Sequence, residues 1–281
     1  MQEINNFKPT KEFLVCIDSD GCAMDTMSIK HKTCFGPKFV DIYGLYDYRE
    51  KVQKLWENIN LYTKTRGINR FQSLALALRT IHEQNICKLS CGFEVLEKWT
   101  KETSALSNDA LYAEFEKNGN SELRLALDWS YAVNEAISAL PDGKYAYNGV
   151  KDALVSMSDS ADIIVVSSAN SEALNREWQT CELTEHLSAM AGQEHGTKAF
   201  LISKLVEVGG YEKSHVLMVG DAMGDLRAAE KTGVLFYPIL AGCEEKSWKK
   251  LSDEAFGKFI TEIYGGEYQL ERIREFEENL S

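Results

Sequence analysis

The stretch Phe13-Leu-Val-Cys-Ile17-Asp18-Ser-Asp20-Gly21 decides how the rest of the sequence is interpreted. Five apolar residues without polar alternation are typical of a strand that is buried on both faces, as in a parallel sheet. Two carboxylates follow directly, and because they are two residues apart on an extended backbone they project from the same face. Gly21 lets the chain turn there without a Cβ clash. The stretch therefore predicts a buried strand that delivers two carboxylates to one edge of a sheet.

Apolar runs of the same character return after about residue 145 and alternate with helical patterns. Helices are predicted over residues 197–208 and through Ala228-Ala229, which Gly233 follows. Strands that alternate with helices imply right-handed crossovers and a parallel sheet covered on both faces. The predicted fold class is therefore α/β, with a Rossmann-like parallel sheet core. Four further strands are predicted at residues 163–166, 187–191, 216–219 and 234–239.

The sequence between about residues 27 and 140 is mostly helical in pattern. Pro141-Asp-Gly143 ends the last of these helices. The simplest organisation is a discontinuous core domain, residues 1–26 and 143–281, with an α-helical domain over residues 27–142 inserted after the first strand. One apolar stripe recurs there at three- and four-residue steps and comprises Leu123, Ala126, Ser130, Val133, Ile137 and Leu140.

Charge and composition exclude several classes of partner. Lys and Arg number 31 against 43 Asp and Glu, which gives a formal net charge of −12. That balance argues against nucleic acid and against an anionic membrane surface, since both are bound by basic side chains. No run approaches the roughly 18–20 apolar residues of a membrane helix, and the polar start of the chain contains no signal-peptide core. We therefore expect a cytoplasmic protein whose seven cysteines are buried thiols.

The candidate site consists of side chains at the carboxyl ends of the predicted strands, where open parallel sheets bind ligands. Four carboxylates gathered at one point repel one another, and a hard divalent cation such as Mg²⁺ resolves that repulsion. A metal and Lys198 would neutralise phosphate charge, while Ser167 donates to a phosphate oxygen. One carboxylate can attack phosphorus and its neighbour can protonate the leaving alcohol. The set comprises Asp18, Asp20, Ser167, Lys198, Asp221 and Asp225.

These residues resemble, in the same order along the chain, the four motifs of the haloacid dehalogenase (HAD) superfamily. The first motif is DxDG with another Asp four residues on, and it is similar to Asp18-Ser-Asp-Gly-Cys-Ala-Met-Asp25. The second motif is a Ser or Thr that ends an apolar strand, and Val165-Val-Ser167 resembles it. The third is a Lys, which Lys198 resembles. The fourth is GDxxxD, which Gly220-Asp-Ala-Met-Gly-Asp225 resembles. Cys22 stands where the family usually has Thr. The resemblance implies a HAD-like core with a helical cap in the first insertion position (C1 type).

The same resemblance implies a role for each residue. Asp18 would be the nucleophile, Asp20 the general acid and base, and Ser167 and Lys198 the groups that hold the phosphate. The implied activity is that of a Mg²⁺-dependent phosphatase acting on a small phosphorylated metabolite through an aspartyl-phosphate. Relatives that cleave carbon–halogen bonds lack an acid at the place of Asp20. The implied Mg²⁺ ligands are Asp18, Asp20 (through its backbone carbonyl), Asp221 and, less specifically, Asp225.

Candidates for further substrate contacts are less specific. Ser168 follows Ser167, and Arg66 and Arg70 lie in a basic, glycine-containing loop of the helical block. Arginine suits bidentate pairing with an anionic substrate, but a solvated surface role is equally compatible with the sequence.

Two alternatives to a phosphatase stay open. A phosphomutase on the same scaffold would use the same residues but return the phosphate to a sugar. A non-enzymatic, receiver-like phosphate-binding module also gathers Asp and Lys beyond a parallel sheet, but such modules are far shorter and have neither the second Asp nor a large cap.

Overall fold

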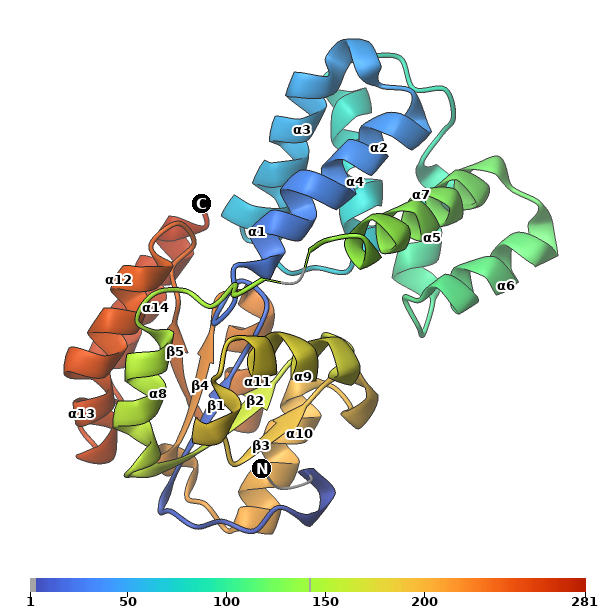
Figure 1. Ribbon diagram of the computed structural model, residues 1–281. Coiled ribbons are helices and arrows are strands. Elements are labelled where there is room, and N and C mark those ends of the chain that lie inside the picture. The colour runs from blue at the N-terminus through green and yellow to red at the C-terminus, as the bar shows by residue number, and fades with distance from the viewer. Residues whose placement is uncertain (1–3, 142) are drawn as a thin grey trace. The chain divides into compact units, whose positions relative to one another are not determined.

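The computed structural model describes residues 4–141 and 143–281, and Figure 1 shows its helices and strands in chain order. Contacts divide the chain into two compact units. The first comprises the described residues of Met1–Met27 and Asp142–Ser281, and the second is Ser28–Pro141. The strands found among the described residues all belong to the first unit, whereas the second is helical.

The five strands of the first unit form one parallel sheet in the order β3-β2-β1-β4-β5. The central strand is β1, in which Ile17 pairs with Val165 of β2 and with Val219 of β4. The predicted α/β class is thus confirmed, including the buried first strand. The strand bounds are Phe13–Ile17 (β1), Ala161–Val166 (β2), Ala189–Ala191 (β3), Val216–Gly220 (β4) and Leu235–Pro238 (β5).

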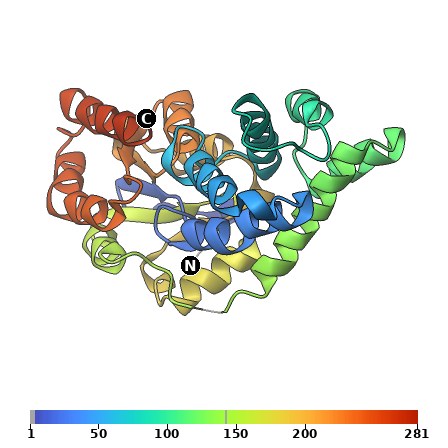
Figure 2. The ribbon, with the colours of Figure 1, turned by 90° about the horizontal axis from the view of Figure 1, so that it is seen from above.

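Helices cover both faces of the sheet, as Figures 1 and 2 show. Alternation along β1 explains the two layers, since Val15 and Ile17 join one apolar core while Leu14 and Cys16 join the other. One core is completed by α8 (Val150–Ser158), α9 (Ser171–Thr180), α12 (Glu244–Lys250) and α13 (Phe256–Ile260). The opposite core is completed by α10 (Lys198–Gly209), α11 (Met223–Thr232) and α14 (Glu267–Asn279).

The helical unit has its own core, built around the fully buried Trp56, Trp129 and Phe71. The predicted stripe lies on α7, where Leu123, Ala126, Ser130 and Val133 are buried and Ile137 is half-buried. The helix ends at Ser138 and does not reach Leu140. The helices are α1 (Thr26–Lys30), which spans the boundary between the units, α2 (Gly36–Tyr43), α3 (Arg49–Glu57), α4 (Arg70–Glu83), α5 (Glu94–Glu102), α6 (Asn108–Asn118) and α7 (Ser121–Ser138).

Short turns of other helical types complete the chain. The 3₁₀ turns are Ile4–Asn6, Tyr46–Tyr48, Thr184–His186, Gln193–His195 and Lys213–His215, and the π turns are His31–Phe35, Asn58–Tyr62 and Leu251–Ala255. Within the described ranges, no helix combines the length and the apolar character that crossing a bilayer requires. The cysteines are free thiols. The prediction of burial holds for Cys16, Cys22, Cys34 and Cys181, but Cys87, Cys91 and Cys243 are half-buried.

Asp162 of β2 is a buried carboxylate that joins three separate segments to the sheet. It accepts hydrogen bonds from the amide and hydroxyl of Thr10 at 2.8 and 2.7 Å and from the amide of Lys11 at 3.0 Å. The hydroxyls of Ser188 and Tyr211 donate to it at 3.0 and 2.7 Å. Burial opposes its ionisation, but these donors outweigh burial and hold the pKa of Asp162 below its ordinary value.

We expect Asp162→Asn to lower the free energy of unfolding by about 1–3 kcal/mol at neutral pH, because an amide cannot accept all five of these bonds. A carboxylate whose folded-state pKa is depressed stabilises the fold above its unfolded pKa of about 4, and that contribution is lost as the pH falls through the folded value. Urea denaturation should therefore show a smaller difference in the free energy of unfolding between Asp162→Asn and the wild type at about pH 3 than at about pH 7.

The matched control is Asp159→Asn, because Asp159 is an exposed acid close to Asp162 in the chain. This variant should stay within about 0.5 kcal/mol of the wild type at neutral pH. A deficit for Asp162→Asn that is equally large in acid would contradict the electrostatic explanation.

Candidate active site

Adjacent strand ends deliver the candidate residues to one edge of the sheet. Asp18 follows β1 directly, and its backbone N–H donates to the carbonyl of Val219 in β4 at 3.0 Å. Asp221 follows β4, and Asp225 lies in the first turn of α11. Lys198 is the first residue of α10, with Thr197 as its N-cap. The chain thus folds so that residues about 200 positions apart meet beyond the central strands.

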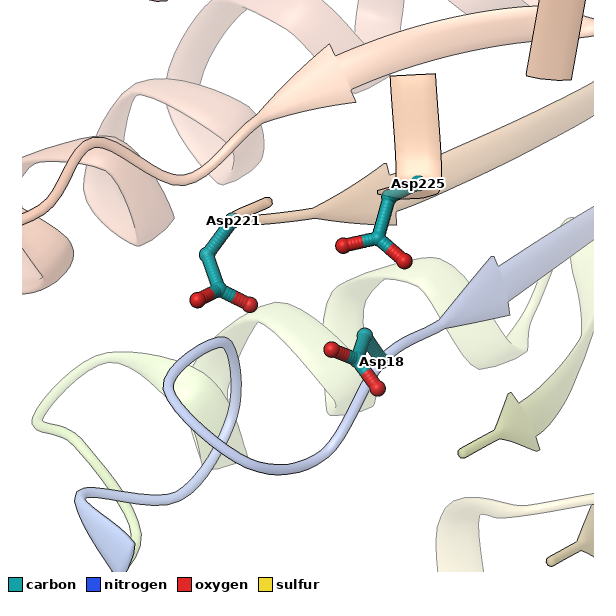
Figure 3. Close-up of side chains that lie close together, drawn as sticks. All are labelled: Asp18, Asp221 and Asp225. Carbon is teal, nitrogen blue, oxygen red and sulfur yellow. The ribbon is translucent and has the colours of Figure 1, made fainter. Parts of the chain in front are cut away.

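The three aspartates and the lysine form a compact cluster. Figure 3 shows the carboxylates of Asp18, Asp221 and Asp225 turned toward one another, and one oxygen of each lies within 4.8 Å of the others. All three residues are buried. Lys198 Nζ lies 2.8 Å from Asp18 Oδ1 and 2.5 Å from Asp225 Oδ1. The ammonium therefore bridges two of the three carboxylates.

Asp225 is held from two sides. Its Oδ1 accepts from Lys198, and its Oδ2 accepts from the backbone N–H of Ala222 at 3.1 Å. Steric crowding explains why the GDxxxD motif has glycine at position 220, since a Cβ there would lie 2.4 Å from the Cβ of Asp225. A side chain at position 220 would push Asp225 away from the cluster, so only glycine fits there.

Electrostatics in the cluster follow from burial and from the balance of charges. Burial raises the pKa of Asp18 well above its usual value; Lys198 opposes this shift, and Asp225 and Asp221 reinforce it. Burial alone would lower the pKa of Lys198, but the Asp18 and Asp225 carboxylates outweigh it and hold that pKa above its ordinary value. The lysine is therefore charged at neutral pH, and its charge favours the ionised form of Asp18.

The turn between β1 and α1 presents the first pair of carboxylates. The carbonyl of Ser19 accepts three successive backbone N–H groups, from Cys22, Ala23 and Met24, at 3.2, 3.0 and 2.9 Å. Gly21 adopts φ of 83°, the left-handed region that favours glycine. Asp20, which is half-buried, accepts a hydrogen bond from the hydroxyl of Thr26.

Cys22, which departs from the motif of the resembled family, is buried in this turn. Its thiol lies 3.6 Å from the carbonyl of Val219, the same carbonyl that accepts from Asp18. Asp25, the last residue of the first motif, accepts from the hydroxyl of Tyr147 at 3.1 Å. The substitution of Cys22 for Thr is thus accommodated by a contact to β4, and the turn still closes.

Ser167 and Ser168 occupy the neighbouring strand end. Ser167 follows β2, is buried, and accepts from the backbone N–H of Ala169 through its hydroxyl at 3.1 Å. Its own amide donates to the carbonyl of Ala191 in β3 at 2.9 Å. Ser168 is exposed. The structure therefore brings Asp18, Lys198, Asp221 and Asp225 into one cluster and places Asp20 and Ser167 on the same sheet edge.

Arg66 and Arg70 belong to the helical unit and are held by it. Arg66 is 2% exposed and donates from Nη1 to the carbonyl of Leu61 at 2.7 Å. The solvated surface role that the sequence left open for this side chain is therefore wrong. Arg70 is half-buried, and its Nη1 donates to Asn134 Oδ1 at 2.6 Å and to the Ser130 hydroxyl at 3.1 Å. Its guanidinium lies over the Phe35 ring, 5.1 Å from the centroid.

Sequence reasoning missed several groups that touch the first motif. Trp178 donates to the hydroxyl of Ser19, Trp248 donates to the carbonyl of Cys22, and Thr26 donates to Asp20. The tryptophans are 159 and 226 residues from their partners, and no local pattern connects such positions. Only Thr26 gives a signal in the sequence, because its hydroxyl lies six residues after Asp20.

The donor set fits a divalent metal. Three carboxylates and one ammonium together carry a formal excess of two negative charges in a buried site. Hard cations such as Mg²⁺ bind through carboxylate oxygens and would balance those charges. Asp225 is less well placed than Asp18 to hold such an ion, because both of its oxygens accept hydrogen bonds, from Lys198 and from the Ala222 amide, whereas the Lys198 contact to Asp18 is at Oδ1.

The charge balance predicts the effect of removing the ammonium. We expect Lys198→Met to lower the free energy of unfolding by about 3–5 kcal/mol in EDTA, because the variant leaves buried carboxylates without their cation. Added Mg²⁺ should narrow that deficit, as measured by urea denaturation. Lys246→Met is the control, since Lys246 is exposed and this change should stay within about 0.5 kcal/mol of the wild type. Equal losses in the two variants would show that Lys198 does not compensate the aspartates.

Several solved structures resemble this chain at low sequence identity. A putative phosphoglycolate phosphatase from Lactobacillus delbrueckii subsp. bulgaricus is 14% identical, with a TM-score of 0.51 over 92% of this chain and 100% of that one. The putative HAD-hydrolase YfnB from Bacillus subtilis, bound to magnesium, is 13% identical, with a TM-score of 0.43 over 82% and 87%. The L-2-haloacid dehalogenase from Xanthobacter autotrophicus is 15% identical, with a TM-score of 0.41 over 92% and 85%.

No curated protein matches the sequence. The model of the haloacid dehalogenase-like hydrolase family matches residues 80–239, more than half of the 281 residues. The matched segment contains Ser167, Lys198, Asp221 and Asp225, whereas Asp18 precedes it. Given the extent of this match and the parallel sheet on which those residues lie, the chain belongs to the haloacid dehalogenase-like hydrolases.

Proposed function

We propose that this hydrolase is a Mg²⁺-dependent phosphatase that cleaves a small phosphorylated metabolite through an aspartyl-phosphate. The observation that carries the proposal is the position of the Asp18 carboxylate, 2.8 Å from the Lys198 ammonium and within 4.8 Å of two other carboxylates. A carboxylate can act as a nucleophile toward phosphorus only where the approaching negative charges are neutralised. This cluster supplies one fixed cation and a donor set for a second.

The proposed first step forms a bond from a carboxylate oxygen of Asp18 to phosphorus and breaks the bond from phosphorus to the ester oxygen. Asp20 gives its proton to the leaving alcohol. In the second step Asp20 takes a proton from water, and the oxygen of that water attacks phosphorus. The bond between phosphorus and Asp18 breaks, which returns the carboxylate and releases inorganic phosphate.

The other residues hold and orient the phosphoryl group. Lys198 would neutralise its charge, and Asp225 would position Lys198 through the 2.5 Å contact. Ser167 would donate its hydroxyl to a phosphate oxygen from the end of β2. Asp18, Asp221, the backbone carbonyl of Asp20 and, as a weaker candidate, Asp225 would hold Mg²⁺. When bound, the ion would supply positive charge that offsets the charge of the phosphoryl oxygens.

Asp20 supports phosphate-ester cleavage over carbon–halogen cleavage. A leaving alcohol needs a proton, whereas a halide does not, so an acid two residues after the nucleophile has a use only in the first reaction. The hydroxyl of Thr26 donates to Asp20, which orients the carboxylate. Ser168, Arg66 and Arg70 remain our candidates for contacts to the rest of the substrate, and the guanidinium of Arg66 is already engaged by Leu61.

Asp18→Asn should reduce phosphate release from p-nitrophenyl phosphate by at least about a thousandfold, because the amide cannot form the acyl phosphate. Circular dichroism should show an unchanged fold. The control is Asp152→Asn, an exposed aspartate on α8, which should keep full activity. Undiminished turnover in Asp18→Asn would exclude Asp18 as the nucleophile.

Removal of divalent metal should silence the wild type, and Mg²⁺ should restore it. At a Mg²⁺ concentration of about 100 times its dissociation constant, binding should also stabilise the fold by about 2.7 kcal/mol. Asp221→Asn should lose most of that stabilisation, as measured by thermal denaturation with and without Mg²⁺. Full activity in EDTA would remove the metal from the proposal. Interconversion of two sugar phosphates with little release of inorganic phosphate would instead indicate a phosphomutase.

A further inference from the structure

Two buried tryptophans contact the turn that carries the proposed nucleophile and the proposed acid. Trp178, near the end of α9, donates its indole N–H to the hydroxyl of Ser19 at 2.9 Å. Trp248, on α12, donates its indole N–H to the carbonyl of Cys22 at 2.9 Å. The two tryptophans, Ser19 and Cys22 are all fully buried.

We infer that Trp178 and Trp248 are positioning residues: their indole N–H groups fix the turn that presents Asp18 and Asp20. The inference rests on the proposed function, because it assigns the tryptophans a part in that reaction. It goes further in naming groups, outside the four sequence motifs, on which the placement of the nucleophile depends.

The geometry of the turn explains why two anchors are needed. Within the turn, the three successive amides of Cys22, Ala23 and Met24 all converge on one acceptor, the carbonyl of Ser19. These bonds set the curvature of the turn. Outside the indoles, the turn is held by the Cys22 thiol near the Val219 carbonyl of β4 and by the Tyr147 amide, which donates to the Ala23 carbonyl at 3.0 Å. The Ser19 hydroxyl and the Cys22 carbonyl face the buried side, where the indoles reach them. Each end of the turn is thereby tied to a different helix.

Chemistry and packing agree on this role. A tryptophan side chain offers one hydrogen-bond donor, its indole N–H, and no acceptor. When it is buried, leaving that donor without a partner costs free energy, so it favours one fixed acceptor. Trp178, Trp248, Cys22, Ala23 and Met24 all belong to the same apolar core. The underside of the turn is therefore part of a close-packed interior, which resists displacement. Asp18 directly precedes this turn, and its reaction requires the carboxylate to be placed to within a fraction of an ångström.

The position of the anchors predicts which kinetic constant they affect. The turn carries Asp18 and Asp20, whereas the groups proposed to hold the phosphate, Lys198 and Ser167, come from α10 and the end of β2. Loosening the turn should therefore slow bond formation more than it weakens phosphate binding.

The test compares Trp178→Phe, Trp248→Phe and Ser19→Ala with Tyr264→Phe. Each Trp→Phe change keeps an aromatic ring and removes the donor, and Ser19→Ala removes the acceptor without opening a large cavity. Tyr264 is the control because its buried hydroxyl donates to the Phe236 carbonyl at 2.7 Å, away from the turn. We expect kcat for p-nitrophenyl phosphate to fall about tenfold or more in the three turn variants. The inhibition constant of inorganic phosphate should change by less than about twofold.

Combining Trp178→Phe with Ser19→Ala should cost no more than the worse single variant, because the two changes break the same bond. The inference is wrong if the turn variants lose no more kcat than Tyr264→Phe at the same loss of thermal stability, or if the double variant shows independent losses.

Hydrogen exchange separates failure of this inference from failure of the proposed function. If the wild type releases no phosphate from any ester, the proposed function fails, but the anchoring can still be measured. The amides of Cys22, Ala23 and Met24 should then exchange about tenfold faster in the Trp→Phe variants than in Tyr264→Phe. Equal exchange in these variants would overturn the anchoring itself.

Discussion

The contact between the Lys198 ammonium and the carboxylates of Asp18 and Asp225 is the interaction on which the site depends. Three buried acids at one point would otherwise repel one another strongly. The lysine is the first residue of α10, Asp18 follows β1, and Asp225 lies in the first turn of α11, so one cation joins three elements of the sheet domain. The remaining negative charge is what makes the cluster suitable for a divalent ion and, with it, for a phosphoryl group.

Much of this arrangement was predictable from the sequence, because it rests on local patterns. The apolar run before Asp18 predicts a strand buried on both faces, and β1 is the central strand of the sheet. The carboxyl ends of parallel strands share one edge, so Asp18 and Asp221, which directly follow strands, are expected at the same edge of the sheet. The requirement for glycine at position 220 is visible in the motif, and its steric cause is the closeness of Asp225.

The rest depends on side chains that meet only after folding. No periodicity connects Trp178 or Trp248 to the turn at Ser19, and Arg66 looks like a surface residue in a basic loop although it is buried against Leu61. The five hydrogen bonds to Asp162 come from three segments of the chain, so a lone acid within an apolar run gives no sign of them. Sequence patterns report backbone geometry and burial, whereas these contacts depend on rotamers and packing.

The sheet domain is interrupted in the sequence by the helical unit, which affects the order in which its strands can pair during synthesis. Phe13 of β1 pairs with Ala161 of β2, and Leu14 pairs with Val216 of β4, so the central strand waits for partners about 150 and 200 residues later. During synthesis the whole helical unit leaves the ribosome before either partner strand emerges. An unpaired apolar strand must therefore avoid aggregation for much of translation. If the inserted helices fold first, they shorten the effective loop that later closes the sheet.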